Sequence, residues 1–250
     1  MKIALITGGS RGLGKSMALA LAKQGQGVIL TYRSQQAEAE QVVSDIEAAG
    51  GKAVALELDM ADSSRFGSFA ESVKTVLREI WQRDQFDGLV NNAGIGLHAS
   101  FEQTSEEQFD ELMKIHFKGP FFLTQALLPL LANQGHILNI SSGLTRFSFP
   151  GYAAYASMKG AIEVLTRYQA KELGERGISV NTLAPGAIAT DFGGGAVRDN
   201  AQLNQMIAGM TALGRVGQAD DIGPVVAQLL SGESKWINGQ RIEASGGMLI

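Results

Sequence analysis

The stretch Thr7-Gly8-Gly9-Ser10-Arg11-Gly12-Leu13-Gly14 follows a short apolar run and opens a helical pattern from Lys15 to Gln24. Glycine has no Cβ, so this segment can turn tightly and let a pyrophosphate approach the backbone. Free N–H groups at the start of a helix favour negative charge at the same point. A strand, a glycine-rich turn and a helix in this order predict a dinucleotide-binding α/β fold.

Outward from this turn, short runs of β-branched and aliphatic residues alternate with helical patterns along the whole chain. In the clearest helical pattern, Phe66 to Ile80, the apolar residues form one stripe. Strands that are apolar throughout need helices on both faces, as in a parallel sheet with right-handed crossovers. We predict one Rossmann-type α/β domain over residues 1–250, a doubly wound parallel sheet of seven strands with helices on both faces. The predicted strands are Lys2–Ile6, Gly27–Thr31, Ala53–Leu58, Phe86–Val90, His136–Ser141, Ile178–Leu183 and Gln240–Glu243.

One long helix is predicted over Phe101–Ala132, and its excess of apolar residues favours an interface between subunits. Its start, Thr104-Ser105-Glu106-Glu107, fits a capping box. In such a box the Thr104 hydroxyl and the Glu107 carboxylate each accept a hydrogen bond from the other residue's backbone N–H.

Composition and charge exclude several classes of function. The 25 acidic and 21 basic residues give a net charge of −4, so no long-range positive field attracts nucleic acid. Without cysteine, and with His98, His116 and His136 widely spaced, we expect no metal site. The longest apolar stretch, Phe121–Ala132, is too short to span a bilayer, and the first residues lack a signal-peptide pattern. We therefore expect a cytoplasmic protein.

The residues after the second predicted strand indicate which dinucleotide binds. At this place a carboxylate normally bonds the ribose 2′-hydroxyl of NAD. Here Leu30-Thr31-Tyr32-Arg33-Ser34 contains no acidic residue, and the next one is Glu38. Arg33, with Arg11 from the glycine-rich turn, offers guanidinium groups that suit a 2′-phosphate. The sequence therefore predicts NADP(H) rather than NAD(H), unless both arginines are simply solvated surface residues.

Tyr155 and Lys159 are four residues apart in a helical pattern, so both side chains lie on one helix face. The pKa of a free tyrosine is about 10, and a nearby ammonium favours the phenolate. Ser142, which follows the predicted strand His136–Ser141, adds a hydroxyl that can bond a carbonyl or alcohol oxygen. The three side chains together indicate proton transfer to or from such an oxygen.

Short motifs follow one another along essentially the whole chain. They are Thr7–Gly14, Asp59, Asn91-Asn92-Ala93-Gly94, Ser141-Ser142, Tyr155–Lys159, Pro185-Gly186 with Thr190, and Asn238-Gly239-Gln240 to Gly246-Gly247. In this order they resemble the short-chain dehydrogenase/reductase family. The resemblance implies an oxidoreductase that transfers a hydride between NADP(H) and a small carbonyl or secondary alcohol substrate. It makes Tyr155 the general acid in reduction and the base in oxidation, with Ser142 holding the substrate oxygen and Lys159 binding the nicotinamide ribose and lowering the pKa of Tyr155.

The same resemblance assigns residues to the cofactor site. Asp59 and Met60 would border the adenine, Asn91 to Gly94 would support the central strand, and Ile188 and Thr190 would contact the nicotinamide carboxamide. The implied cofactor-binding residues are Gly8, Ser10, Arg11, Gly12, Leu13, Gly14, Arg33, Asp59, Met60, Asn91, Ala93, Gly94, Tyr155, Lys159, Pro185, Gly186, Ile188 and Thr190.

His116 departs from the family pattern. Such enzymes usually have an asparagine here, in a stretch like Asn-x-x-Gly-x-Phe, where it anchors a water that relays protons to the lysine. The matching stretch of this chain is Ile115–Phe121. Imidazole donates and accepts hydrogen bonds, so three roles are open: His116 holds the same water, titrates within the relay, or bonds a backbone carbonyl without a catalytic role.

Residues 191–212 are predicted to form a lid over the substrate, with a hinge at Gly193–Gly195 and a helix over Asn200–Met210. The other predicted walls are Ile95–His98 and Leu144–Phe149. Four apolar side chains of these walls predict a partly apolar pocket: Leu97, Leu144, Phe147 and Phe149.

Two other functions stay open. A 3-oxoacyl carrier-protein reductase must bind an acidic carrier, yet Thr124–Gln134 contains no Lys or Arg; Arg146, Arg167 and Lys171 remain available. A catalytically silent NADP(H) sensor would fit the altered position 116, although the intact serine, tyrosine and lysine argue against it. The family resemblance and the apolar end Met248-Leu249-Ile250 further imply a homotetramer.

Overall fold

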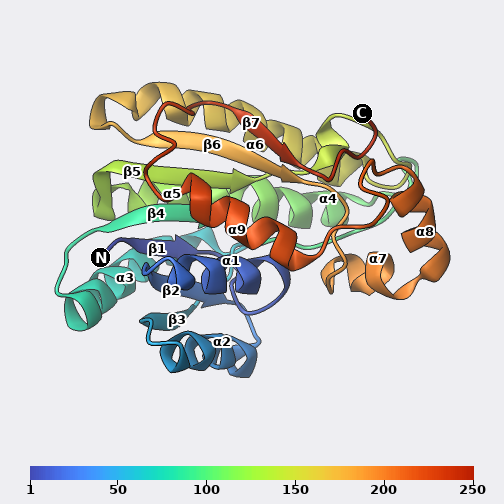
Figure 1. The fold of residues 1–250 in the computed structure, drawn as a ribbon. Helices are drawn as coiled ribbons and strands as arrows, with labels where there is room; N and C mark the ends of the chain where they lie inside the picture. Colours follow the sequence, from blue (N-terminus) through green and yellow to red (C-terminus); the bar gives the residue numbers. More distant parts are fainter.

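The computed structural model describes residues 1–250, with all seven strands in one parallel sheet. The strand order is β3-β2-β1-β4-β5-β6-β7, so the chain begins near the middle of the sheet and winds outward in both directions (Figure 1). Every neighbouring pair is parallel. This confirms the predicted doubly wound fold. The strands are β1 Ile3–Ile6, β2 Gly27–Tyr32, β3 Ala53–Glu57, β4 Phe86–Asn91, β5 Leu131–Ile140, β6 Ser179–Pro185 and β7 Arg241–Ala244.

Helices cover both faces of the sheet, and alternate strand residues supply the two cores. Ile3 and Leu5 of β1 pack with α3 and α5, whereas Ala4 and Ile6 pack with α1, α2 and α9. The predicted stripe from Phe66 to Ile80 is the buried side of α3. The helices are α1 Gly12–Lys23, α2 Gln36–Ala48, α3 Phe66–Trp81, α4 Glu106–Met113, α5 Gly119–Leu127, α6 Ala153–Glu172, α7 Ala196–Asp199, α8 Ala201–Gly209 and α9 Ala219–Leu229.

The prediction of one helix over Phe101–Ala132 is wrong. Phe101 lies in a turn, and α4 is joined to α5 by a π-helical turn at Lys114–Lys118. Leu128–Leu130 forms a 3₁₀ turn that contains Pro129, which has no N–H to continue a helix. Leu131 already pairs with Phe86, so β5 begins five residues earlier than predicted.

The capping box exists, but one residue later than predicted. Ser105 is the N-cap: its hydroxyl accepts from the Gln108 N–H at 3.3 Å, and the Gln108 side chain accepts from the Ser105 N–H at 3.0 Å. The Thr104 hydroxyl instead donates to the carbonyl of Ser100 at 2.8 Å. Thr104 is therefore part of the preceding turn and cannot cap the helix.

Because all strands are parallel, the loops that follow them meet at one edge of the sheet. The glycine-rich turn after β1 and the segments after β4, β5 and β6 meet there. A 3₁₀ turn at Phe192–Gly195, α7 and α8 lie beyond this edge (Figure 1). No helix in the structure combines the length and apolar character needed to cross a membrane.

Candidate active site

The glycine-rich turn is tied to the end of β4 by uncharged groups. The Thr7 hydroxyl accepts from the backbone N–H groups of Asn92 and Ala93, both at 3.0 Å. The Asn92 side chain donates to the carbonyls of Thr7 and Gly8 at 2.9 and 3.0 Å, and the Gly8 N–H donates to the Thr31 hydroxyl at 3.1 Å. The sequence motifs contained Thr7 and Asn92, yet neither was predicted as a site residue.

Gly8 shows why this turn suits a bound diphosphate. Its φ is +68°, and a Cβ there would lie 2.9 Å from the Cα of Ala93. The absence of a side chain at Gly8 therefore lets the turn pack closely against Ala93, and the first turn of α1 carries no acidic residue. Ser10, Gly12, Leu13 and Gly14 lie along this same turn. A tight glycine-rich turn at a helix N-terminus without acidic residues fits the phosphates of a dinucleotide.

The predicted adenosine residues lie along the same edge. Arg11 and Arg33 are exposed, and neither guanidinium has a hydrogen bond or an ion pair within the chain. Asp59 follows β3, and its carboxylate accepts from the Ala61 N–H at 2.8 Å; Met60 is buried. Two unpaired cations beside the β1 turn favour a ligand with additional negative charge.

Asn91 supports the sheet, as expected. Its side chain donates to the Thr124 hydroxyl at 3.1 Å and to the Asn139 side chain at 2.8 Å, which joins β4 to α5 and β5. Gly94 is exposed where the chain leaves β4.

The segment after β6 lies opposite the glycine-rich turn. Pro185 ends β6, and the Gly186 N–H donates to the carbonyl of Ala244 at 3.1 Å. The side chain of Thr190 comes so close that a Cβ on Gly12 would lie 3.6 Å from the Thr190 Cβ. Ile188 is half-buried beside Gly217. The structure thus brings Gly12 and Thr190, far apart in sequence, to one place.

Tyr155 and Lys159 lie side by side on α6, and both are buried. The Lys159 ammonium donates to the carbonyl of Ile140 at 2.8 Å and lies 5.6 Å from the centre of the Tyr155 ring. Ser142 follows β5, and its hydroxyl accepts from the Leu144 N–H at 3.2 Å. The three predicted catalytic side chains are therefore brought together at the edge where the glycine-rich turn lies.

Burial sets the protonation of this group. It raises the pKa of Tyr155, and a hydrogen bond with Ser142 partly opposes that rise. Burial also lowers the pKa of Lys159 to about 8. At neutral pH the phenol is protonated and the ammonium exchanges protons easily, so this pair can deliver a proton to an oxygen placed against Tyr155.

His116 lies in the π-helical turn and is buried. Its Nε2 is 2.9 Å from the carbonyl oxygen and 3.2 Å from the N–H nitrogen of Ile95, and its ring meets that of Tyr155 edge-on at 5.1 Å. Nδ1 has no partner within the protein. Burial, with the charge of Lys159, holds the pKa of His116 well below its usual range. A neutral ring bonded to a backbone carbonyl matches the third of the predicted roles, and this pKa disfavours titration near pH 7.

The two other histidines lie outside the site chemistry. His98 is exposed and meets the Tyr152 ring edge-on at 5.0 Å. His136 is buried in β5, where its Nδ1 lies 2.7 Å from the Ser179 hydroxyl, and burial lowers its pKa to about 4.

Only part of the predicted apolar pocket lies against Tyr155. Leu97 and Leu144 pack around Tyr155. Phe147 and Phe149 instead pack against the cluster that contains Ile207 of α8, so they contact the predicted lid. Leu97 and Leu144 therefore pack beside Tyr155, whereas Phe147 and Phe149 pack beside α8, and a substrate wall formed by all four stays a prediction.

The predicted lid segment contacts Tyr155 through Phe192, a residue that the sequence did not single out. The Phe192 ring lies 5.8 Å from the Tyr155 ring and is 45% exposed. A Cβ on Gly96 would lie 2.7 Å from Gly193, so the lid and the segment after β4 touch here. A lone phenylalanine in a glycine-rich segment gives too weak a sequence signal to mark it.

Comparison with known proteins agrees with this geometry. A family model described as enoyl-(acyl carrier protein) reductase matches residues 8–249. The 3-oxoacyl-[acyl-carrier-protein] reductase FabG of Staphylococcus aureus is 38% identical, over 100% of this chain and 98% of its own length.

Two solved structures are similar throughout. One is LugOII, a promiscuous reductase that catalyses keto-reduction at C1 during lugdunomycin biosynthesis, with a TM-score of 0.94, 38% identity and coverage of 100% of this chain and 98% of that one. The other is the landomycin C-6 ketoreductase LanV with bound NADP and rabelomycin, with a TM-score of 0.90, 35% identity and coverage of 99% and 96%. With the glycine-rich turn, Ser142, Tyr155 and Lys159 in place, this chain belongs to the short-chain dehydrogenase/reductase family.

Proposed function

We propose that this oxidoreductase reduces a carbonyl group of a small molecule to a secondary alcohol with NADPH, and catalyses the reverse reaction with NADP⁺. The observation that carries the proposal is the group formed by Ser142, Tyr155 and Lys159 beside the bare glycine-rich turn. The NADP bound to the similar ketoreductase LanV supports the choice of cofactor.

The cofactor would be held by residues from four loops. The backbone from Gly8 to Gly14 faces the diphosphate, and the free guanidinium groups of Arg11 and Arg33 face the 2′-phosphate. Asp59 and Met60 border the adenine, while Ile188 and Thr190 lie on the nicotinamide side. When bound, the cofactor supplies the hydride. NAD(H) would leave both arginines without their anionic partner.

The protein supplies the proton. The Ser142 hydroxyl bonds the substrate oxygen, and Tyr155, kept protonated by burial, donates its proton to that oxygen as negative charge develops there. Lys159 binds the ribose, and its positive charge favours the phenolate that remains. Because the pKa of Lys159 is about 8, it returns a proton to Tyr155 near neutral pH.

His116 is proposed as a neutral residue that fixes Ile95 beside Tyr155. Its Nε2–H donates to the carbonyl of Ile95 and so holds the start of one substrate wall. The free Nδ1 can accept a hydrogen bond from a water near Lys159, which would give His116 the water-holding role of the usual asparagine.

Apolar side chains around Tyr155 favour an apolar or aromatic carbonyl compound. Leu97, Leu144 and Phe192 present such surfaces toward the tyrosine. LugOII catalyses keto-reduction at C1 during lugdunomycin biosynthesis, and LanV is a C-6 ketoreductase with rabelomycin bound, which supports this substrate class for the present chain. A lid formed by residues 191–212 would close over the substrate.

The second candidate is reduction of a 3-oxoacyl group on a carrier protein, because the FabG of Staphylococcus aureus is 38% identical over the whole chain. Such a carrier is acidic and needs basic residues near the site. α5 contains none, and the first turn of α4 carries Glu106 and Glu107. Lys114 and Lys118 of the turn between these helices are the nearest basic residues in the chain, so the acidic first turn of α4 and the uncharged α5 give only limited support to a free small molecule over a carrier.

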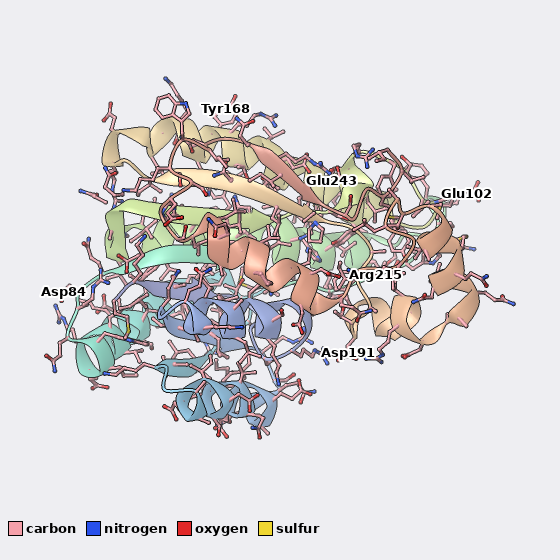
Figure 2. All side chains as sticks on the ribbon, viewed as in Figure 1. Asp84, Glu102, Tyr168, Asp191, Arg215 and Glu243 are labelled. Atoms are coloured by element: carbon pink, nitrogen blue, oxygen red, sulfur yellow. The ribbon has the colours of Figure 1, made fainter.

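Apolar side chains on the outer surface support assembly into a homotetramer. Phe121 and Phe122 of α5 and Val164 and Tyr168 of α6 are exposed, and Figure 2 shows Tyr168 pointing away from the sheet. Light scattering should give the mass of four chains, and a monomer at micromolar concentration would contradict the assembly.

The test of function is NADPH consumption with a panel of aromatic ketones, diketones, sugars, acyl thioesters and acylated carrier protein. We expect turnover on one or more ketones. Preference for the carrier-bound substrate over its thioester fragment would select the second candidate. NADPH binding without turnover on any compound would indicate a sensor.

A further inference from the structure

A carboxylate continues the catalytic stripe of α6. Tyr155, Lys159 and Glu163 follow one another at intervals of four residues, so they lie along one helix face. Oε1 of Glu163 accepts from the Ser141 hydroxyl and from the Thr145 hydroxyl, both at 2.7 Å. Ser141 precedes the turn from Ser142 to Arg146, which we call the Ser142 turn, and Thr145 lies within it. Glu163 thus links this turn to α6, the helix that carries Tyr155.

Arg241 of β7 joins the same group from the other side. Its Nε donates to Glu163 Oε1 at 2.8 Å and its Nη1 to Glu243 Oε2 at 3.0 Å. Its Nη2 lies 3.3 Å from the carbonyl oxygen of Ser142, which the Thr145 hydroxyl also approaches, at 2.9 Å. The side chains of Arg241 and Glu163 are only 24% and 15% exposed, so solvent screens this pair weakly.

A second arginine closes the network over the turn. Arg146 bonds both oxygens of Glu243, at 2.9 and 2.8 Å. Burial raises the pKa of Glu243, but hydrogen bonds from Arg146, Arg241 and Ser245 outweigh it and hold the pKa at about 2. Glu243 lies on β7, at the rim of the sheet (Figure 2). The turn from Ser142 to Arg146 is therefore anchored at both ends by charged side chains.

Stability alone does not account for such a network. Partly buried ion pairs contribute little to folding, since desolvation offsets their attraction, and apolar residues of similar size often serve as well. The charged side chains instead fix the orientation of the turn. Arg241 holds the carbonyl of Ser142, and the Leu144 N–H holds the Ser142 hydroxyl. A hydroxyl that must meet the same substrate oxygen as Tyr155 benefits from a rigid backbone.

We propose that Glu163 and Arg241 are positioning residues. They hold Ser142 where its hydroxyl and that of Tyr155 reach the same substrate oxygen. The proposal rests on the carbonyl reductase function proposed above. It assigns to two residues outside the catalytic group a part in the rate of the chemical step, and none in cofactor binding.

Arg241→Met tests this directly on a ketone that the wild type reduces. We expect kcat to fall about tenfold, as small misplacements of catalytic groups do, while the Kd for NADPH stays unchanged. Arg241→Lys keeps one donor and should recover part of the loss. The matched control is Arg83→Met, which breaks the similarly buried pair with Asp87. Asp87 lies at the start of β4, whereas Ser142 follows the end of the parallel strand β5, so this pair is at the opposite edge of the sheet from the Ser142 turn. The control should leave kcat unchanged.

The Ser142→Ala background separates positioning from general structure. If Arg241 acts through Ser142, Arg241→Met should lower kcat of the wild type but not of Ser142→Ala. Thermal unfolding of each variant gives the folded fraction for normalisation. If Arg241→Met does not fold, Glu163→Gln replaces it in the same cycle, with the same expectation.

Equal loss of kcat in both backgrounds would overturn the proposal, as would a kcat equal to that of Arg83→Met. Absence of turnover by the wild type is a different result, because it overturns the proposed function first and the positioning role with it.

Discussion

On the β1 side of the site, Thr7 and Asn92 hold the glycine-rich turn with hydroxyl and amide groups, whereas on the β5 side Glu163 and Arg241 hold the Ser142 turn with charges. The buried ionisable side chains are also divided unevenly between the two sides. The buried ionisable residues all come after β4 in the chain: His116, His136, Tyr155 and Lys159.

This difference matches what each side has to do. A bound dinucleotide brings its own negative charge, so the β1 side needs only bare N–H groups and two free arginines. In the proposed reaction the β5 side stores and releases a proton, which requires side chains with shifted pKa values in fixed positions. Changes on the β1 side should therefore alter affinity, and changes on the β5 side should alter rate and pH dependence.

Tyr155→Phe should have the largest effect. It removes only the oxygen that transfers the proton, so turnover should fall by a factor of about 10² to 10⁴ while NADPH still binds. Steady-state kinetics and a fluorescence titration of NADPH measure the two quantities. A variant that keeps more than a few per cent of the wild-type rate would show that the proton comes from another group.

His136, on β5, should make the free energy of unfolding of the protein depend on pH. Its pKa is about 4 in the folded chain and near 6.5 when unfolded, so the unfolded chain binds a proton first. The neutral His136 ring contributes its full stabilisation above pH 6.5. This stabilisation, about 3 kcal/mol in the free energy of unfolding, is lost as the pH falls toward 4.

Urea unfolding at several pH values measures this slope. His136→Asn should flatten it, and His98→Asn, at an exposed position, should leave it as in the wild type. Equal slopes for the wild type and His136→Asn would contradict the assignment to His136.

Arg11→Ala combined with Arg33→Ala should change cofactor choice on the β1 side. Charge-assisted bonds to a 2′-phosphate contribute about 1.5 to 3 kcal/mol each, so the wild type should bind NADPH at least about tenfold more tightly than NADH. The double variant should lose this preference and keep its turnover with saturating cofactor. Tighter binding of NADH by the wild type would refute the role of both arginines.

His116→Ala should have the smallest effect. Loss of the bond to Ile95 should lower stability by about 1 kcal/mol. Turnover per folded enzyme decides between the remaining roles: a rate within about twofold of the wild type leaves His116 as a support for Ile95, and a larger loss that His116→Asn restores assigns it the water of the relay.

The local patterns of both sides were predictable from the sequence, and the side chains that hold them in place, Thr7 and Asn92 on the β1 side and Glu163 and Arg241 on the β5 side, were not. The glycine-rich turn and the Tyr155–Lys159 pair are local patterns, so neighbours in sequence already define their geometry. Glu163 and Arg241 lie on different elements, and nothing in the sequence pairs them before β7 is placed beside β6. Periodicity also failed to locate the breaks between Phe101 and Ala132, because hydrogen bonds of single side chains and one proline decide them.

We propose that Tyr155 on the β5 side delivers a proton to the substrate oxygen while the cofactor, held by the β1 turn, supplies the hydride to the carbonyl carbon. The most direct test uses NADPH carrying deuterium at the transferring position and a ketone that the enzyme consumes, with the product analysed by mass spectrometry and chiral chromatography. The account predicts one deuterium on the alcohol carbon and a single enantiomer. An alcohol without deuterium, or NADPH consumed without formation of alcohol, would contradict it.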